Sequence, residues 1–385
     1  MDFNEFKRKL RAFDYVLFIL VCSLSIFGII VIGSAKHINT EGYALEYSKQ
    51  QLWFVTGIIM LIMVSFIDYK FISKFYIVAY VVNIVLLVLV IQIGHSTNLG
   101  ATRQLGIGGA SIQPSEFAKI FMIVYLSKFI DKFNDKINNI FMLMFIILSV
   151  IIPFILVMKQ PSLSASLVIV VIATVMIFVG GISYKYIAAV FAVGIPSAII
   201  VIQDLLRPDH IFIDKILKPY QIEHRILPFL NPELGSKDIL YQTGQSVKAI
   251  ASGQLNGQGL YNGTLNSLNY LPASHNDFIF AVIGEEFGYI GCMAVLFVIL
   301  LIVIKCIAIA YKADTLTGRL IAAGTAFMFT FQTFVNIGVA TNLLPNTGMA
   351  LPFVSYGGSA MWVNMLCVGL VINVGMVKPK SLFEE

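Results

Sequence analysis

The sequence predicts an all-α integral membrane protein, a single polytopic domain over residues 1–385 built as a ten-transmembrane-helix bundle with one large extracellular loop. Hydrophobic residues make up 58% of the chain and charged residues only 12%, whereas a soluble domain carries about 25% charged residues. Apolar runs long enough to cross about 30 Å of hydrocarbon recur along the chain. Basic residues gather in alternate connections between these runs. We therefore expect several membrane spans and not a soluble domain.

The predicted spans are 13–34, 51–67, 75–94, 114–131, 138–157, 163–181, 185–202, 277–309, 319–340 and 348–376. The run 51–67 is short and the run 114–131 contains Glu116 and Lys119, so these two depart most from an ideal span. The first run has no small-residue cleavage site after its basic flank, so we expect it to be kept as a helix and not removed as a signal peptide. An even number of spans puts both termini on one side.

The distribution of Lys and Arg predicts which side that is, because cytoplasmic loops carry an excess of both. The N-terminus, alternate short loops and their flanking span ends hold Lys7, Arg8, Lys9, Arg11, Lys70, Lys74, Lys128, Lys132, Lys136, Lys185, Lys305, Lys312, Arg319, Lys378 and Lys380. The opposite short loops hold only Lys36, Lys49, Arg103 and Lys159. Both termini are therefore predicted to be cytoplasmic. The net charge of +5 follows from this topology and does not indicate nucleic-acid binding.

Residues 203–275 form the one long connection, outside the cell between the seventh and eighth spans. A polar stretch of this length in a compact bundle is usually functional or disordered. Its apolar content favours folding onto the bundle, with a short amphipathic helix over 239–252. The glycine-rich piece that follows lacks the Gly-Lys-Ser/Thr ending of a P-loop, so no nucleotide site is predicted. All four cysteines fall in apolar segments, which excludes a disulfide framework or a cysteine metal site.

Asp277 is the most informative polar residue, because it stands with His275 where the long loop meets the eighth span. A carboxylate at a membrane mouth is costly to desolvate and is seldom kept there without a use. The alternative is that Asp277 is a plain helix N-cap, a position that Asp favours. His275 alone is typical of a surface histidine.

Further candidates are cations and polar groups on the outer side. Glu116 and Lys119 are three residues apart and share a helix face. They predict either a satisfied internal salt bridge or a lysine that faces a polar cavity and binds an anionic head group. Arg103, Arg225 and Lys248 add positive charge that suits an anion or a pyrophosphate lipid. An interfacial Arg alone more often meets lipid phosphate.

Three deeper features are also informative. Glu285 and Glu286 are adjacent inside the eighth span, so at least one must find a partner or water within the bundle. Gln332 and Asn336 lie on one face of the ninth span, which is typical of hydrogen bonds between helices. The segment 345–359 has two prolines and three glycines, which predicts a broken helix beside protein or a watery cavity.

These blocks together resemble the SEDS family (shape, elongation, division and sporulation proteins), which includes RodA, FtsW and SpoVE. The most specific blocks are 276–286 and 345–359, and Gln113-Pro114-Ser115-Glu116 is nearly as specific. The resemblance implies a peptidoglycan glycosyltransferase of the bacterial plasma membrane that polymerises lipid II, with a class B penicillin-binding protein as partner. The family's essential acid falls on Asp277. Gln160-Pro161 favours the RodA branch.

Three positions depart from the family pattern. Gln104 replaces an aromatic residue, Ala273 replaces Glu, and Ser162 with Ser164-Ala165 replaces Asp with Gly-Thr. The change at Ser162 removes an acid from the predicted site. These differences concern substrate contacts and are compatible with a weakly active or specialised paralogue.

The resulting hypothesis is an inverting transfer in which Asp277 is the general base. The predicted substrate contacts are Lys119, Glu116, Arg103, His275, Arg225, Lys248 and Ser355. Lys119, Arg103 or a divalent cation, Mg²⁺ or Mn²⁺, would stabilise the departing pyrophosphate, although no metal-ligand motif is present. Two other classes stay open: a lipid II flippase, because polar groups and broken helices also suit transport, and a non-catalytic scaffold that activates the penicillin-binding protein.

Overall fold

Each predicted span coincides with a helix in the computed structural model, which describes residues 3–35, 44–96, 102–107, 110–160, 162–205, 229, 237–271 and 274–377. The helices at these spans are α2 (Tyr15–Ala35), α3 (Ala44–Phe66), α5 (Tyr76–Ile93), α6 (Pro114–Lys132), α7 (Ile140–Lys159), α8 (Leu163–Val179), α9 (Tyr184–Leu205), α15 (Ile279–Lys312), α16 (Leu316–Ala340) and α17 (Gly358–Met376). Seven of the described helices are long and apolar enough to cross a membrane. The helix α8 is apolar but has 17 residues, and α6 carries charges along its length.

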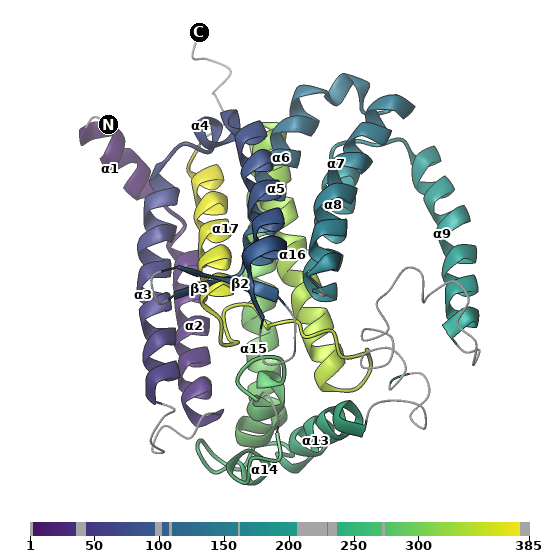
Figure 1. The fold of residues 1–385 in the computed structure, drawn as a ribbon. Helices are drawn as coiled ribbons and strands as arrows, with labels where there is room; N and C mark the ends of the chain where they lie inside the picture. The colour runs from purple at the N-terminus through teal and green to yellow at the C-terminus, as the bar shows by residue number, and fades with distance from the viewer. Residues whose placement is uncertain are drawn as a thin grey trace.

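Shorter elements complete the described chain. They are α1 (Phe3–Ala12), α4 (Tyr69–Lys74), a 3₁₀ turn η1 (Asn134–Lys136), α13 (Lys237–Ser252) and α14 (Thr264–Ser267). The predicted amphipathic helix over 239–252 is confirmed as α13, which begins two residues earlier. In Figure 1, α13 and α14 lie at the end of the bundle opposite to α1 and the C-terminal end of α17. Both ends of the described chain therefore lie at one end of the bundle, as an even number of spans requires.

A small antiparallel sheet departs from the purely helical prediction. Its strands are β1 (His95–Ser96), β2 (Thr102–Ile107) and β3 (Ala110–Ile112). The strands β2 and β3 pair with Leu105 opposite Ile112. These strands are too short to give a clear alternation of polar and apolar residues, so the sequence predicts only a loop here.

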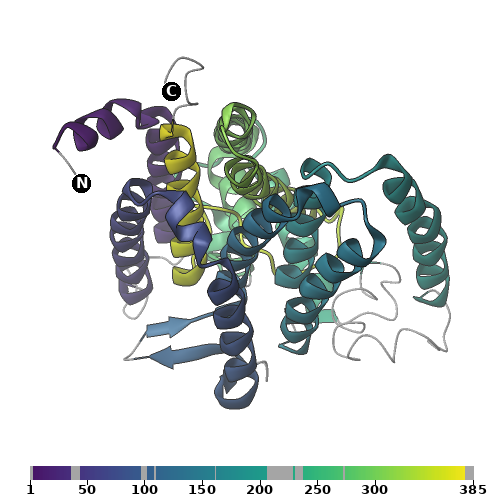
Figure 2. The same cartoon turned by 90° about the horizontal axis from the view of Figure 1, so that it is seen from above.

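The helices α16 and α17 form the centre of the bundle. In the apolar spans of α16 and α17, 72% and 78% of the residues are buried in the protein, against 22% in α3 and 17% in α5. The closest packing joins α17 to α3, α15 to α16 and α5 to α6. Seen along the bundle in Figure 2, α9 stands at the periphery. The central helices are therefore the ones placed to build a site inside the protein.

The predicted eighth span is broken in the structure. Gly288 in α15 has φ 64° and ψ −162°, which interrupts the helix. The backbone N–H groups of Gln258 and Gly259 donate to the carbonyls of Glu285 and Glu286, each at 2.9 Å. In return, the first N–H groups after the break donate to the carbonyls of residues 254 and 255. The glycine-rich loop thus supplies the hydrogen bonds that the broken helix loses, as a low-dielectric setting demands.

Both carboxylates beside this break have protein partners. Glu285 accepts from the backbone N–H groups of Leu265 at 2.6 Å and Asn266 at 3.2 Å. Glu286 accepts from the hydroxyl of Ser34 at the end of α2. Both glutamates are fully buried. The expectation that at least one finds a partner inside the bundle is confirmed, and these acids join α14 and α2 to α15.

Candidate active site

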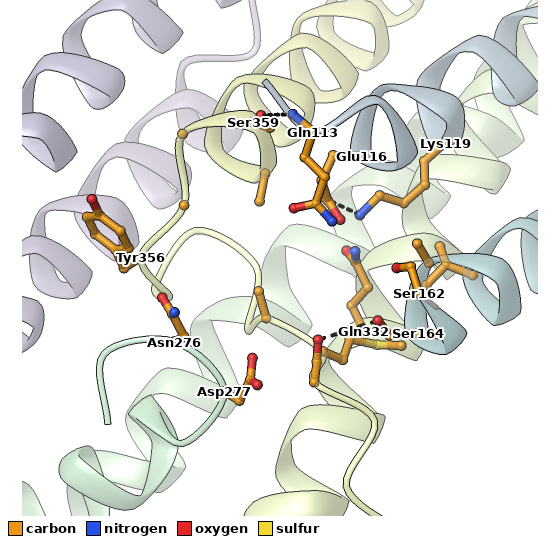
Figure 3. A pocket seen from close by; sticks show the side chains of 18 of the residues that line it. Gln113, Glu116, Lys119, Ser162, Ser164, Asn276, Asp277, Gln332, Tyr356 and Ser359 are labelled. Atoms are coloured by element: carbon orange, nitrogen blue, oxygen red, sulfur yellow. Dashed lines mark hydrogen bonds and ion pairs between the residues drawn. The ribbon is translucent and has the colours of Figure 1, made fainter. Parts of the chain in front are cut away.

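A cavity of about 560 Å³ lies between the start of α6, the start of α8, the segment before α15, α16 and the segment leading into α17. Its lining residues include Gln104, Gln113, Glu116, Lys119, Ser162, Ser164, Asn276, Asp277, Gln332, Tyr356 and Ser359. Figure 3 shows these polar side chains arranged around one space. The lining is drawn from residues as far apart in the chain as 53 and 360.

Asp277 lies directly before the first turn of α15 and is half-buried. Its side chain points into the cavity (Figure 3). The N-cap of α15 is Phe278, one residue later than the alternative interpretation of Asp277 as a plain N-cap expects.

The backbone of the segment that carries Asp277 is held at three consecutive carbonyls. The backbone N–H of Tyr356 donates to His275 at 2.9 Å, the hydroxyl of Ser355 to Asn276 at 2.7 Å, and the amide of Asn336 to Asp277 at 2.9 Å. Asn336 also donates to the carbonyl of Met349 at 2.7 Å. We call the three hydrogen bonds to the carbonyls of His275, Asn276 and Asp277 the carbonyl staple. They fix the start of α15 against α16 and the broken segment before α17.

Glu116 and Lys119 lie across the cavity from Asp277 (Figure 3). The ammonium nitrogen of Lys119 is 2.6 Å from Glu116 Oε2, and the two side chains are 1% and 16% exposed. Both residues also line the cavity. The predicted internal salt bridge is confirmed, and the pair also faces the space beside Asp277. Binding of an anionic head group by Lys119 stays a prediction.

Three helices begin at the cavity wall. Gln113, Ser162 and Gly357 are the N-cap residues of α6, α8 and α17, and none of them caps its helix with a side-chain hydrogen bond. The N-terminus of a helix carries partial positive charge and backbone N–H groups that favour anions. Together with Lys119, these helix ends give the wall opposite Asp277 an electrostatic preference for a negatively charged group.

The other predicted contacts lie elsewhere. Ser355 is 5% exposed, and its hydroxyl accepts from the N–H of Leu351 while donating to Asn276. The ring of His275 packs against Tyr356, and Lys248 is exposed on α13. None of these three is among the described residues that line the cavity. Ser355 and His275 instead belong to the carbonyl staple, because their polar backbone or hydroxyl atoms are used there.

The two remaining predicted cations are Arg103 and Arg225. Arg103 lies in β2, whereas Arg225 lies outside the described residues, as does Ala273, one of the departures from the family pattern. The other departures, Gln104 and Ser162, both line the cavity. The change at Ser162 therefore alters the wall next to the site.

Gln332 is the cavity residue that sequence reasoning assigned to another role. A hydrogen bond between helices is the prediction for its side chain, yet its Oε1 is buried without a hydrogen-bond partner in the part of the chain that the structure describes. It lines the cavity instead. The available signal was a carboxamide inside a span, four residues before the structural Asn336.

A divalent cation is compatible with this wall in one way. Among the described residues, no group of three or more His, Cys, Asp or Glu side chains is placed to hold a metal ion. Mg²⁺, however, is often bound by one or two carboxylates together with substrate phosphates. Glu116 and Asp277 are the carboxylates among the described lining residues, so either of them, together with substrate phosphates, would fit such an ion.

Residues 14–380 match the profile of a family of cell cycle proteins that comprises FtsW, RodA and SpoVE. The chain belongs to this family. A probable peptidoglycan glycosyltransferase FtsW of Trichlorobacter lovleyi is 32% identical over 372 residues, which cover 95% of this chain and 94% of that protein. A peptidoglycan glycosyltransferase RodA of Treponema pallidum is 30% identical over 429 residues, which cover 95% of this chain and 98% of that protein.

Solved structures have the same fold as this SEDS protein. A chain of a peptidoglycan synthase complex that coordinates polymerization and crosslinking superimposes with a TM-score of 0.75 at 27% identity, covering 94% of this chain and 97% of that one. RodA of Thermus thermophilus superimposes with a TM-score of 0.67 at 24% identity, covering 94% and 96%. The helical, multi-pass membrane fold predicted from the sequence is confirmed.

Proposed function

We propose that this SEDS protein is a peptidoglycan glycosyltransferase that polymerises lipid II at the outer face of the bacterial plasma membrane, in cell elongation or shape. The observation that carries the proposal is one cavity with Asp277 on one side and the Glu116–Lys119 pair on the other. This arrangement offers a base and an anion-binding wall at opposite sides of the reacting atoms. The names of the two relatives support the same activity.

In the proposed reaction, Asp277 accepts the proton of the acceptor sugar hydroxyl as its oxygen attacks the anomeric carbon of the donor. The new C–O bond forms while the bond from that carbon to the pyrophosphate breaks, and the electron pair leaves with the pyrophosphate. One base on the attacking side suffices for an inverting transfer. Positioned acid–base help contributes about 10²–10⁴-fold to such a rate.

Lys119 and the starts of α6, α8 and α17 stabilise the charge that develops on the departing pyrophosphate. Glu116 holds the ammonium group of Lys119 in place at 2.6 Å. We assign Arg103 as a second cation for the lipid phosphates, and Arg225 and Lys248 as outer contacts that attract the anionic substrate. His275 and Ser355 act through the backbone of the Asp277 segment.

We further propose that a divalent cation, Mg²⁺ or Mn²⁺, would bind with the substrate phosphates in this cavity, where a lining carboxylate, Glu116 or Asp277, would help to hold it. Such an ion would supply positive charge to the leaving group. We expect a chelator to lower polymer formation by purified protein and added Mg²⁺ to restore it, as measured by gel separation of labelled glycan. Full activity in excess chelator would remove the ion from the proposal.

The proposed setting follows from charge and from the likeness to a synthase complex. We infer that both termini are cytoplasmic, because the loops on their side of the bundle carry the excess of Lys and Arg. A class B penicillin-binding protein is the proposed partner, which would crosslink the strands that this protein makes. The likeness of this SEDS protein to a chain from a complex that coordinates polymerization and crosslinking supports that pairing.

The decisive experiment uses the purified protein with its penicillin-binding partner in liposomes that contain lipid II. We expect Asp277→Asn to keep the wild-type thermal unfolding profile and to abolish polymer. Polymer at the wild-type rate would remove Asp277 from the mechanism. Flipping of labelled lipid II without polymer by the wild type would favour a transporter, and a complex that forms without any glycan would favour a scaffold.

The two acidic residues inside the eighth span give little support to a transporter. Glu285 and Glu286, the residues that most favour transport, accept hydrogen bonds from α14 and α2 and are fully buried. Their contacts explain their presence as parts of the fold. The polar groups around Asp277, in contrast, face a cavity.

A further inference from the structure

Gln332 on α16 is a polar side chain in the cavity wall whose acceptor has no hydrogen-bond partner within the described ranges. The residue is 5% exposed, and its Oε1 is buried. Figure 3 shows its carboxamide pointing into the cavity towards the Glu116–Lys119 pair. A buried acceptor without a donor forfeits the hydrogen bonds it would make in water, so its retention needs an explanation.

Several neighbouring polar groups in the same wall have protein contacts. The Lys119 ammonium donates to Glu116, Ser359 Oγ accepts from the Gln113 N–H at 2.9 Å, and Ser164 Oγ donates to the Gly348 carbonyl at 3.4 Å. Gln332 Oε1 has no such contact, a state that Asn276 Oδ1 shares in this wall. These buried acceptors are the positions where a bound molecule would supply a donor.

The chemistry of that partner is a neutral hydrogen-bond donor. A carbonyl oxygen cannot pair with a phosphate anion, and Lys119 and the helix ends already serve negative charge. Lys119 in turn cannot serve a donor group, because its ammonium has no acceptor. Amino sugars of the proposed substrate class carry two kinds of neutral donor: hydroxyls, which all sugars have, and the N–H of the acetamido group at C2, which distinguishes them from other sugars.

We propose that Gln332 is a specificity residue that accepts a hydrogen bond from the acetamido N–H of the sugar bound in this cavity. The proposal rests on the proposed function, because it takes the substrate to be a lipid-linked amino sugar. It adds a residue that distinguishes acetamido sugars from sugars that lack this N–H. A site with a buried hydrogen-bonding group rejects an analogue that lacks the matching group.

The test compares two lipid-linked ligands, one with the natural acetamido group and one in which an O-acetyl ester replaces it. The ester keeps the shape and the carbonyl and removes only the N–H. Dissociation constants are measured for both ligands with the purified full-length protein. We expect the wild type to bind the ester about 10- to 100-fold more weakly. A wild type that binds both ligands equally would overturn the proposal.

Variants assign that preference to Gln332. Gln332→Met has a similar length and no acceptor of this kind, and we expect it to bind the two ligands equally. Gln332→Glu keeps an acceptor oxygen, and we expect it to keep the preference even if the added charge weakens both affinities. Thr330→Val, at an exposed position of the same helix, is the control and should match the wild type.

A wild-type preference in Gln332→Met would overturn the assignment, as would its loss in Gln332→Glu with normal thermal unfolding. The readout is binding, so it is separate from polymer formation. A protein that prefers the acetamido ligand but makes no polymer would contradict the proposed activity and leave the role of Gln332 standing. A protein that makes polymer but binds both ligands equally would overturn the role of Gln332 and leave the proposed activity standing.

Discussion

Lys119 carries a positive charge although the residue is only 1% exposed inside a membrane protein. It is therefore the cavity residue whose charge most needs a partner. A buried charge is stable only when it is paired and hydrogen-bonded, and removing one partner leaves the other uncompensated. Glu116 provides the pairing at 2.6 Å. Two roles follow for Lys119: it neutralises Glu116, and it faces the site where we place the pyrophosphate.

A double-mutant comparison separates these roles. Lys119→Met alone should abolish polymer and lower the unfolding temperature, because it strands the Glu116 carboxylate; the cost of breaking a buried pair is about 3–5 kcal/mol. Glu116→Gln combined with Lys119→Met removes the stranded charge, so we expect stability to recover while polymer formation stays lost. Recovered polymerisation in the double variant would show that Lys119 serves Glu116 alone.

At the scale of elements, the site depends on how α16 and the broken segment before α17 grip the start of α15. The carbonyl staple joins three consecutive residues of one segment to Asn336, Ser355 and Tyr356. A segment held at three successive carbonyls has little freedom to shift relative to the cavity. Backbone hydrogen bonds also hold α15 at Gly288, where the glycine-rich loop replaces the helical hydrogen bonds lost at the break.

The staple predicts a positioning role for Asn336. Asn336→Leu leaves two carbonyls without their donor, each at a cost of about 1–3 kcal/mol, and lets the Asp277 backbone move. We expect the turnover rate to fall about 10- to 100-fold while the affinity for lipid II stays within about twofold, measured as kcat against binding. Equal losses in both quantities would indicate a general packing defect.

The break in α15 predicts a strict need for glycine at position 288. Its φ of 64° and ψ of −162° belong to a region that is essentially restricted to glycine, and a Cβ there would lie 2.6 Å from the Leu255 carbonyl oxygen. Gly288→Ala should therefore lower the unfolding temperature in detergent clearly. Gly375→Ala is the control, since its Cβ would meet Ile309 at an ordinary 3.4 Å. Equal stability of the two variants would contradict the strained break.

At the scale of the molecule, the ten helices at the predicted spans form a bundle with α1 at one end and α13 and α14 at the other. The basic residues of α1 belong to the side with excess Lys and Arg. The position of α13 at the opposite end agrees with an external location of the long connection. The cavity can then receive a lipid-linked substrate from the outer side.

Labelling in cells tests this orientation. In a background without the four natural cysteines, Lys248→Cys on exposed α13 should react with a membrane-impermeant maleimide added outside. Lys7→Cys on exposed α1 should react only after the membrane is permeabilised. The reverse pattern would invert the topology and place the cavity's partners on the other side.

Sequence by itself determined the spans, because hydrophobicity over about 20 residues is a local property that the bilayer enforces. It also singled out Asp277 and the Glu116–Lys119 spacing, since charged groups are rare in spans. The meeting of these residues with Gln332 in one cavity, the carbonyl staple and the partners of Glu285 and Glu286 depend on contacts across the chain, such as the one that joins residues 34 and 286. Only the tertiary structure decided those, because a local pattern holds no information about which distant backbone groups become neighbours once the helices pack.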